Sequence, residues 1–301
     1  MRNLTEQSRL LTGLLRERIL VLDGAMGTMI QQANLTAADF GGPALEGCNE
    51  NLVLTRPDVI TDIHRKYLEA GADIIETDTF GSTSLVLAEY GLADRAYEIS
   101  RAAGELARRA ADEFSTSAKP RFVAGSMGPT TKAITVTGGV TFDGLRETFY
   151  QQARGLLDGG VDILLLETCQ DTRNIKAGAL AIEQLAAERG HRIPLMISAT
   201  IEAMGSMLAG QDAEALWASI DHIDLLSIGL NCATGPEFMT DHIRTLSGLS
   251  RHSISCYPNA GLPNEDGKYG ETPTSIATQL ERFIGNGWLN LVGGCCGTTP
   301  E

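Results

Sequence analysis

The chain has 301 residues, of which 43% are hydrophobic and 21% are charged. This length and apolar content suit one α/β barrel or two smaller folded domains. The formal net charge of -14 at pH 7 argues against a nucleic-acid partner, because phosphate binding depends on clusters of Lys and Arg. We therefore predict a small-molecule partner.

The sequence contains no run of about 18 apolar residues that could span a bilayer. Residues 1–18 alternate charges with leucines and lack the apolar core of a signal peptide. We predict a cytoplasmic protein without membrane attachment. Its six cysteines are then expected to be reduced thiols, so a cluster among them indicates a metal or catalysis before disulfides.

In chain order, the first predicted element is a helix over residues 4–18, which we expect to cap the bottom of a barrel. Short β-rich runs then alternate with longer segments of helical periodicity, which is typical of a parallel α/β protein. The eight predicted strands are residues 19–22, 73–77, 122–126, 163–167, 195–200, 225–231, 254–258 and 289–292.

Eight strand–helix units in about 250 residues are what a closed (β/α)8 TIM barrel requires. An open doubly wound sheet is the alternative, and the absence of a Gly-x-Gly-x-x-Gly motif after the first strand disfavours it. The sequence stops at Glu301, directly after the eighth predicted strand. We therefore expect one barrel domain over residues 1–301 that lacks its final helix and is a fragment of a longer multidomain protein.

The strongest chemical signal is Gly293-Gly-Cys-Cys-Gly297 at the end of the last predicted strand. Adjacent cysteines rarely pair with each other, because the ring would be strained. Cys232 ends the sixth predicted strand, so in a barrel it would share a rim with Cys295 and Cys296. Three thiolates with a vacant fourth position are typical of catalytic zinc. The alternative is that they are small buried residues packed beside glycines.

The other cysteines and the histidines carry weaker signals. Cys256 lies in mid-strand and is predicted to be a core residue, Cys48 lies in a polar loop, and Cys169 follows a strand end. The five histidines fall in or beside helical patterns or at strand starts, so none is predicted to be a metal ligand.

Carboxylates form a second group at predicted strand ends. Asp23 ends the first strand, Glu76 and Asp78 flank the end of the second, and Glu167 ends the fourth. In a barrel these side chains would ring the active-site mouth, where Asp23 and Glu167 would suit an ammonium group. The alternative is that they cap the following helices. The loop Gly125-Ser-Met-Gly-Pro-Thr130 could offer backbone amides to a carboxylate, or be an ordinary turn.

With these residues identified, the chain resembles the homocysteine S-methyltransferase family, most closely the N-terminal module of its cobalamin-dependent methionine synthases. The resemblance covers nearly the whole chain and its motifs are highly specific in combination. They are Leu22-Asp-Gly-Ala-Met-Gly-Thr-Met-Ile-Gln31, Thr55-Arg-Pro-Asp-Val-Ile60, Ile75-Glu-Thr-Asp-Thr-Phe80, Leu166-Glu-Thr-Cys169, Gly229-Leu-Asn-Cys232, Tyr257-Pro-Asn-Ala-Gly261 and Gly293-Gly-Cys-Cys-Gly297.

The resemblance implies a (β/α)8 barrel and site roles for eight residues. The zinc ligands would be Cys232, Cys295 and Cys296. The substrate amino group would meet Asp23 and Glu167, the substrate carboxylate would meet backbone amides at Ser126 and Met127, and Asn259 would lie near the zinc when substrate is absent.

The implied reaction is zinc-dependent methyl transfer to the thiol of L-homocysteine, giving methionine. The expected donor is methylcobalamin bound on another domain, with 5-methyltetrahydrofolate as the ultimate donor, so cobalamin- and folate-binding domains of the same longer chain are the expected partners. The loop over residues 34–50 and Gly267-Lys-Tyr-Gly-Glu-Thr-Pro273 favour this donor over betaine or S-methylmethionine. A non-catalytic zinc-binding barrel is the alternative from another class.

Overall fold

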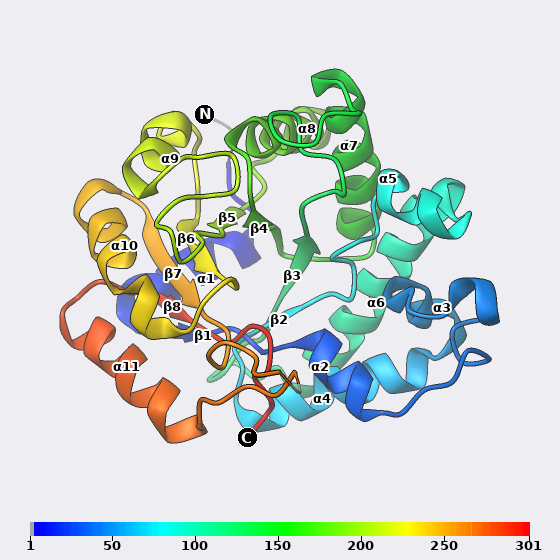
Figure 1. The fold of residues 1–301 in the computed structure, drawn as a ribbon, viewed down its shortest axis with the longest axis horizontal. Coiled ribbons are helices and arrows are strands. Elements are labelled where there is room, and N and C mark those ends of the chain that lie inside the picture. The colour runs from blue at the N-terminus through cyan, green and yellow to red at the C-terminus, as the bar shows by residue number, and fades with distance from the viewer. Residues whose placement is uncertain (1–2, 266) are drawn as a thin grey trace.

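Eight parallel strands form a closed barrel in the computed structural model, which describes residues 3–265 and 267–301 (Figure 1). The strands pair in the order β1-β8-β7-β6-β5-β4-β3-β2, and a parallel bridge between Leu22 and Ile74 joins the two ends of the sheet. The predicted TIM barrel is therefore confirmed. The strands are β1 Leu20–Val21, β2 Ile74–Glu76, β3 Phe122–Met127, β4 Ile163–Cys169, β5 Leu195–Ala199, β6 Ser227–Asn231, β7 Ser253–Tyr257 and β8 Leu291–Val292.

The α-helices lie outside the sheet, with α1 beneath one end of the barrel and the others around it (Figure 1). They are α1 Glu6–Glu17, α2 Met26–Gln32, α3 Leu52–Thr55, α4 Pro57–Ala70, α5 Ser84–Leu87, α6 Ala96–Phe114, α7 Phe142–Asp158, α8 Thr172–Arg189, α9 Ala213–Ile220, α10 Pro236–Leu249 and α11 Pro273–Gly285. Four short 3-10 turns, Pro43–Leu45, Asn49–Asn51, Ala88–Tyr90 and Ala93–Arg95, complete the described helical segments.

Local sequence signals explain several helix ends. Pro57 occupies the first turn of α4, where its missing N–H costs no hydrogen bond. Gly71 and Gly190 end α4 and α8 in the left-handed conformation that glycine adopts without a Cβ penalty. Gly159 is the C-cap of α7, and Gly160 directly after it adopts the left-handed conformation.

Alternation along the strands builds two apolar layers. In β4, Ile163 and Leu165 belong to the cluster inside the barrel, whereas Leu164 and Leu166 belong to the larger cluster between strands and helices. This period of two is a direct consequence of strand geometry. The same alternation continues past the apolar part of each strand. Inward-facing residues at the strand ends therefore point into the barrel mouth.

The first helix closes the opposite end of the barrel. Leu11 and Leu15 of α1 are buried in the same cluster as the inward-facing Phe122 and Ile163 near the strand starts. The predicted helix over residues 4–18 is thus present, and it packs where we expected a cap.

The ring of helices is open between α11 and α4. A groove of about 500 Å³ lies there, and Val21 on its floor is 40% exposed. Within the described residues, no helix covers the outer face of β1 and β8 at this place.

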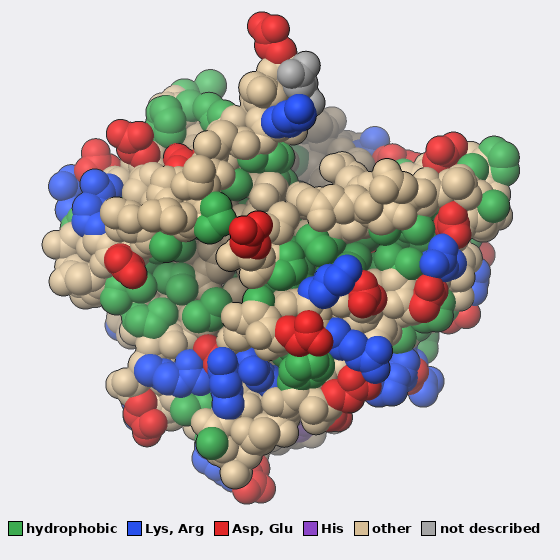
Figure 2. Space-filling view, turned by 90° about the horizontal axis from the view of Figure 1, so that it is seen from below, with side chains coloured by type: hydrophobic (Ala, Val, Ile, Leu, Met, Phe, Trp, Pro, Cys, Tyr) green, Lys and Arg blue, Asp and Glu red, His purple; other side chains and the backbone are tan. Residues whose placement is uncertain are grey.

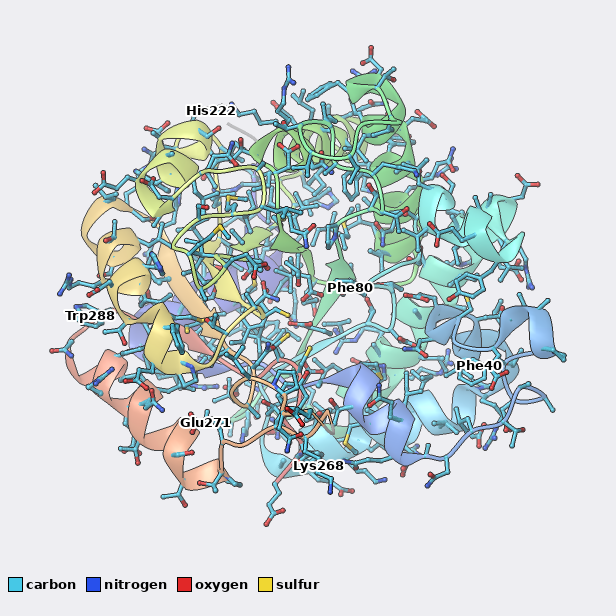
Figure 3. The ribbon with its side chains drawn as sticks, in the orientation of Figure 1. Phe40, Phe80, His222, Lys268, Glu271 and Trp288 are labelled. Atoms are coloured by element: carbon cyan, nitrogen blue, oxygen red, sulfur yellow. The ribbon has the colours of Figure 1, made fainter. Side chains whose placement is uncertain are left out.

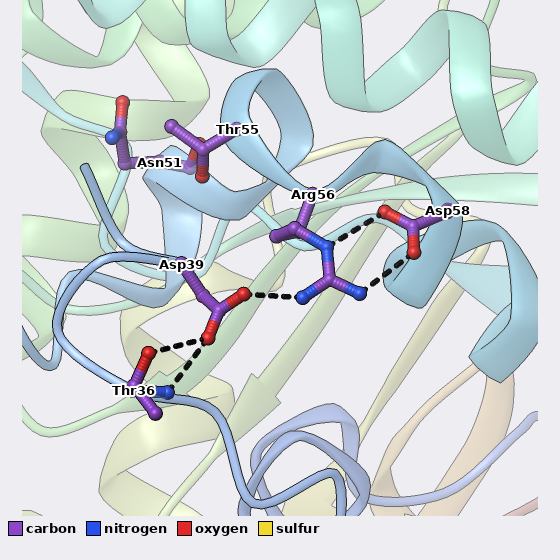
Figure 4. A network of polar contacts seen from close by, with 6 residues as sticks. All are labelled: Thr36, Asp39, Asn51, Thr55, Arg56 and Asp58. Atoms are coloured by element: carbon purple, nitrogen blue, oxygen red, sulfur yellow. Dashed lines mark hydrogen bonds and ion pairs between the residues drawn. The ribbon is translucent and has the colours of Figure 1, made fainter.

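An ion-pair network fastens the segment between α2 and α4 (Figure 4). The guanidinium of Arg56 donates two hydrogen bonds to Asp58, at 3.0 and 2.8 Å, and also contacts Asp39. The backbone N–H and hydroxyl of Thr36 both donate to Asp39 at 2.8 Å. Together these donors, with Thr36 contributing most, lower the pKa of Asp39 to about 2. The network ties this segment to the start of α4.

The surface carries charges of both signs. On the face shown in Figure 2, acidic and basic side chains lie interspersed among apolar and uncharged ones. None of the described helices combines the length and apolar character needed to cross a bilayer.

Candidate active site

Three cysteines from two strand ends meet at one rim of the barrel. Cys232 directly follows β6, and Cys295 and Cys296 lie just beyond β8. The Sγ atom of Cys296 lies 4.0 Å from that of Cys232 and 4.0 Å from that of Cys295. All three sulfurs lie within 4.8 Å of one another, and none forms a disulfide. The sequence-predicted triad is therefore brought together.

The spacing of these sulfurs fits a tetrahedral cation. Zinc–sulfur bonds of about 2.3 Å at tetrahedral angles place ligand sulfurs about 3.8 Å apart. Hydrogen bonds, first from Cys232 and then from Cys295, lower the pKa of Cys296 to about 3, whereas hydrogen bonds with Cys232 and Cys296 raise the pKa of Cys295. Among the described residues, this is the one group of three that could hold a metal, and it includes no histidine. His222 lies at the edge of the molecule near α9 (Figure 3).

The loop that carries the cysteine pair is anchored to the end of β7. The backbone N–H of Cys296 donates to Asn259 Oδ1 at 3.1 Å, and that of Cys295 donates to the Pro258 carbonyl at 2.8 Å. Gly297 has φ +83°, and a Cβ there would lie 2.4 Å from the ring of Tyr269. Glycine is required at this position to turn the chain beneath that ring. Asn259 thus lies beside the cysteine pair.

The segment between β7 and α11 borders this rim. It carries Lys268 and Glu271, whereas Phe80 from the segment after β2 lies nearer the centre of the mouth (Figure 3). Phe80 is 43% exposed. Within the described residues, loops that follow several different strands border the mouth of the barrel. This is usual for the C-terminal face of this fold.

Three carboxylates converge beneath the mouth. Asp23, Glu76 and Glu167 come from the ends of β1, β2 and β4. Asp23 Oδ2 accepts a hydrogen bond from the backbone N–H of Glu76 at 2.9 Å, and the hydroxyl of Ser126 donates a short hydrogen bond to Glu167. Asp23 and Glu167 are only 6% and 5% exposed. The cluster is therefore largely shielded from water.

Burial governs the acid–base behaviour of this cluster. It raises the pKa of Glu167 to about 7, although the hydrogen bond from Ser126 opposes the shift. Burial also raises the pKa of Asp23 and of Glu76 well above the ordinary range, and the negative charge of Glu167 adds to both shifts. A buried cluster of this kind favours a cation, which would restore the ionised forms.

The remaining acidic candidate lies elsewhere. Asp78 is buried, and its pKa is raised by burial and then by the charge of Glu50. The charged neighbour that acts on Asp78 is thus Glu50, from the 3-10 turn before α3, and not a member of the cluster of Asp23, Glu76 and Glu167. Cys48 from the predicted polar loop is also buried there, with an exposure of 0%.

Ser126 and Met127 end β3, but their backbone is already partly occupied. The backbone N–H of Ser126 donates to Thr77 Oγ1 at 3.0 Å. The side chain of Met127 packs into the apolar layer between strands and helices. In this structure the Ser126 amide is therefore not free for a substrate carboxylate, and the residue reaches the mouth through its hydroxyl.

Asn231 directly precedes Cys232, and no sequence motif predicts a role for it. Its side chain is fully buried and bonds to residues from β4, β5 and the cysteine loop. The alternation of side chains along β6 is the one sequence signal for such a role. It places Asn231 on the inward side of the strand, next to a predicted metal ligand.

Comparison with known proteins agrees with this geometry. A family model described as homocysteine S-methyltransferase matches residues 20–301. Methionine synthase from Mycobacterium leprae (strain TN) is 46% identical over 290 residues, which cover 95% of this chain and 24% of that protein. The chain thus spans about a quarter of the length of this curated relative.

Solved structures show the same fold. The homocysteine methyltransferase MmuM from Escherichia coli, in its metallated form, is 25% identical with a TM-score of 0.78, covering 98% of this chain and 96% of that chain. Its oxidized form gives the same identity and TM-score. Because the family model covers nearly the whole barrel, the chain belongs to the homocysteine S-methyltransferase family.

Proposed function

We propose that this chain transfers a methyl group to the thiol of L-homocysteine, giving methionine, with zinc held by Cys232, Cys295 and Cys296. The observation that carries the proposal is the meeting of these sulfurs at zinc spacing. The family and the 46% identical methionine synthase support the reaction class.

The site offers complementary groups to both ends of homocysteine. The thiol would enter beside the cysteine triad. The ammonium group would meet Asp23 and Glu167, whose burial strengthens attraction to a cation. The hydrogen bond from Ser126 fixes the orientation of the Glu167 carboxylate. Substrate orientation would thus come from buried groups on rigid strand ends.

When bound, zinc supplies the Lewis acidity that favours the deprotonated form of an incoming thiol. Three anionic cysteines leave the centre with net negative charge, so the substrate sulfur would keep its electron density. The carboxylates would hold the amino acid while its sulfur, the methyl carbon and the leaving group align, and such orientation lowers a barrier by several kcal/mol or more.

We further propose that residues 1–301 form the homocysteine domain of a longer protein. The methyl donor would be methylcobalamin on another domain, replenished by 5-methyltetrahydrofolate on a folate-binding domain. Higher identity to a methionine synthase, 46% against 25% for the Escherichia coli homocysteine methyltransferase, favours this donor. The chain's 24% share of the longer relative is consistent with additional domains.

Metal analysis and a methyl-transfer assay test the proposal together. The 301-residue chain should bind one zinc and form methionine from homocysteine and free methylcobalamin. Cys295→Ala and Cys296→Ala should each lose both zinc and turnover. The matched control is Cys256→Ala, because Cys256 is buried between strands and helices and donates to Met239 at 3.7 Å. Stoichiometric zinc with normal turnover in either rim variant would refute the assignment.

A donor comparison separates the alternatives. Turnover with betaine or S-methylmethionine, but not with methylcobalamin, would replace the proposed donor while leaving the thiol chemistry intact. Tight zinc binding without methyl transfer from any of the three donors would favour a non-catalytic barrel.

A further inference from the structure

We infer that Asn231 is a positioning residue that hydrogen-bonds the Cys295 sulfur and links it to the backbone beside Glu167. This inference rests on the proposed zinc-dependent function. Asn231 ends β6, directly before Cys232, and its side chain is 0% exposed. Its Nδ2 lies 3.9 Å from Cys295 Sγ.

The hydrogen-bond partners fix the orientation of the Asn231 amide. The backbone N–H of Thr168 can only donate, and it donates to Asn231 Oδ1 at 3.0 Å. The hydroxyl of Ser198 donates to the same oxygen at 2.7 Å. The opposite edge of the amide must then carry the N–H groups. That edge faces Thr168 Oγ1 at 2.8 Å and the Cys295 sulfur.

Thr168 is held in a conformation that needs external support. Its φ is +51°, a region rarely adopted by a β-branched residue. The pairing of β4 with β5 shifts register between Leu166 and Cys169, so the regular ladder is interrupted here. Asn231 bonds both the backbone N–H and the hydroxyl of Thr168. It therefore stabilises the turn that immediately follows Glu167.

The same amide affects the charge on the cysteine cluster. An N–H directed at a thiolate stabilises negative charge on sulfur and makes that sulfur a weaker electron donor. Asn231 would thus hold Cys295 in place for the metal while preventing excessive charge build-up among three thiolates. One buried side chain would thus fix the position of the zinc ligands relative to the carboxylates that bind the amino group.

Asn231→Asp is the most discriminating variant. The carboxylate has the shape of the amide and can still accept from Thr168 and Ser198, but it presents an oxygen to Cys295. Asn290→Asp is the matched control, because Asn290 Oδ1 likewise accepts a backbone N–H, from Ile254 at 2.9 Å, at the far end of the barrel. The two variants make the same chemical change with and without contact to the triad.

We expect Asn231→Asp to fold and to bind zinc about 10- to 100-fold more weakly in a chelator competition, the usual cost of losing a partner of a metal ligand. In the Co(II)-substituted protein, its sulfur-to-metal charge-transfer band should move to longer wavelength, because the sulfur becomes a stronger donor. Asn290→Asp should match the unmodified chain in both measurements. Circular dichroism would verify folding.

Unchanged zinc affinity and an unchanged band in folded Asn231→Asp would overturn the inference. If this variant does not fold, Asn231→Ser supplies the test, because its hydroxyl is too short to reach Cys295. The same weakening and band shift are expected, and their absence would overturn the inference. An unmodified chain that binds neither zinc nor Co(II) would instead refute the proposed function.

Discussion

Asp23 and Glu76 are joined at the barrel mouth by a hydrogen bond of 2.9 Å from the Glu76 backbone N–H to Asp23 Oδ2. The contact crosses the closing seam of the sheet, where Leu22 bridges Ile74. Asp23 therefore has one observed role and one proposed role. Its oxygen accepts a backbone hydrogen bond, and its charge would attract the ammonium group of the substrate.

Substitutions of Asp23 should separate these roles. Asp23→Ala leaves the Glu76 N–H without its acceptor and should lower the free energy of unfolding by about 1–3 kcal/mol. Asp23→Asn keeps an acceptor oxygen and should remain close to the unmodified chain in stability, yet bind homocysteine more weakly. Urea unfolding and calorimetric titration measure the two effects. Full homocysteine affinity in Asp23→Asn would exclude a role for its charge.

Glu167→Gln should affect substrate affinity far more than zinc content. A hydrogen bond to a charged group contributes about 1.5–3 kcal/mol, so the Kd for homocysteine should rise by about ten- to a hundredfold. Glu183→Gln, on the exposed side of α8, is the control. Titration of the zinc-loaded proteins gives the comparison. Equal affinities in the two variants would remove Glu167 from the amino-group site.

The raised pKa of Glu167 predicts a pH-dependent difference in stability. Since its pKa is about 7 in the fold and about 4.3 in an unfolded chain, the folded state binds more protons between these values. The contribution of Glu167 to the free energy of unfolding is therefore fully present below about pH 4 and is lost as the pH rises through 7. Glu167→Gln lacks this titration and should gain stability relative to the unmodified chain over that range.

Unfolding free energies of zinc-free, substrate-free protein at pH 5.5 and pH 8 would measure this relative gain. The full effect between low and high pH is on the order of 4 kcal/mol, and part of it falls within this interval. A difference between the two proteins that does not change with pH would contradict the assigned shift.

Gly297→Ala should disturb the cysteine rim through two physical causes. The left-handed backbone at φ +83° costs about 1–2 kcal/mol for a residue with a Cβ, and that Cβ would collide with the Tyr269 ring. Gly190→Ala is a matched control, because Gly190 has φ +72° but no atom near the added Cβ. Zinc competition and thermal unfolding should show weaker zinc binding for Gly297→Ala alone.

Local patterns in the sequence predicted the architecture because a parallel barrel repeats one simple unit. Apolar runs such as residues 163–167 alternate with helices that begin and end at Pro and Gly, and each run became a strand. The cysteine triad could be predicted for the same reason, since Cys232 and the Cys295–Cys296 pair follow strand ends that must share one face of the barrel.

Side-chain pairing across the mouth could not be predicted in this way. Ser126 donates its backbone N–H to Thr77, and Asn231 bonds Thr168, only because strand stagger and a local register shift bring these groups together. Neither feature leaves a periodic trace in the sequence. Burial of Cys48 likewise depends on how the segment before α3 packs.

In the proposed function, three cysteine sulfurs hold a zinc ion and leave one position for the substrate thiol. X-ray absorption at the zinc edge of the loaded chain, with and without L-homocysteine, tests it most directly. We expect three sulfur neighbours of the zinc at about 2.3 Å without substrate and four with it. A sulfur count that stays the same on adding homocysteine would contradict it.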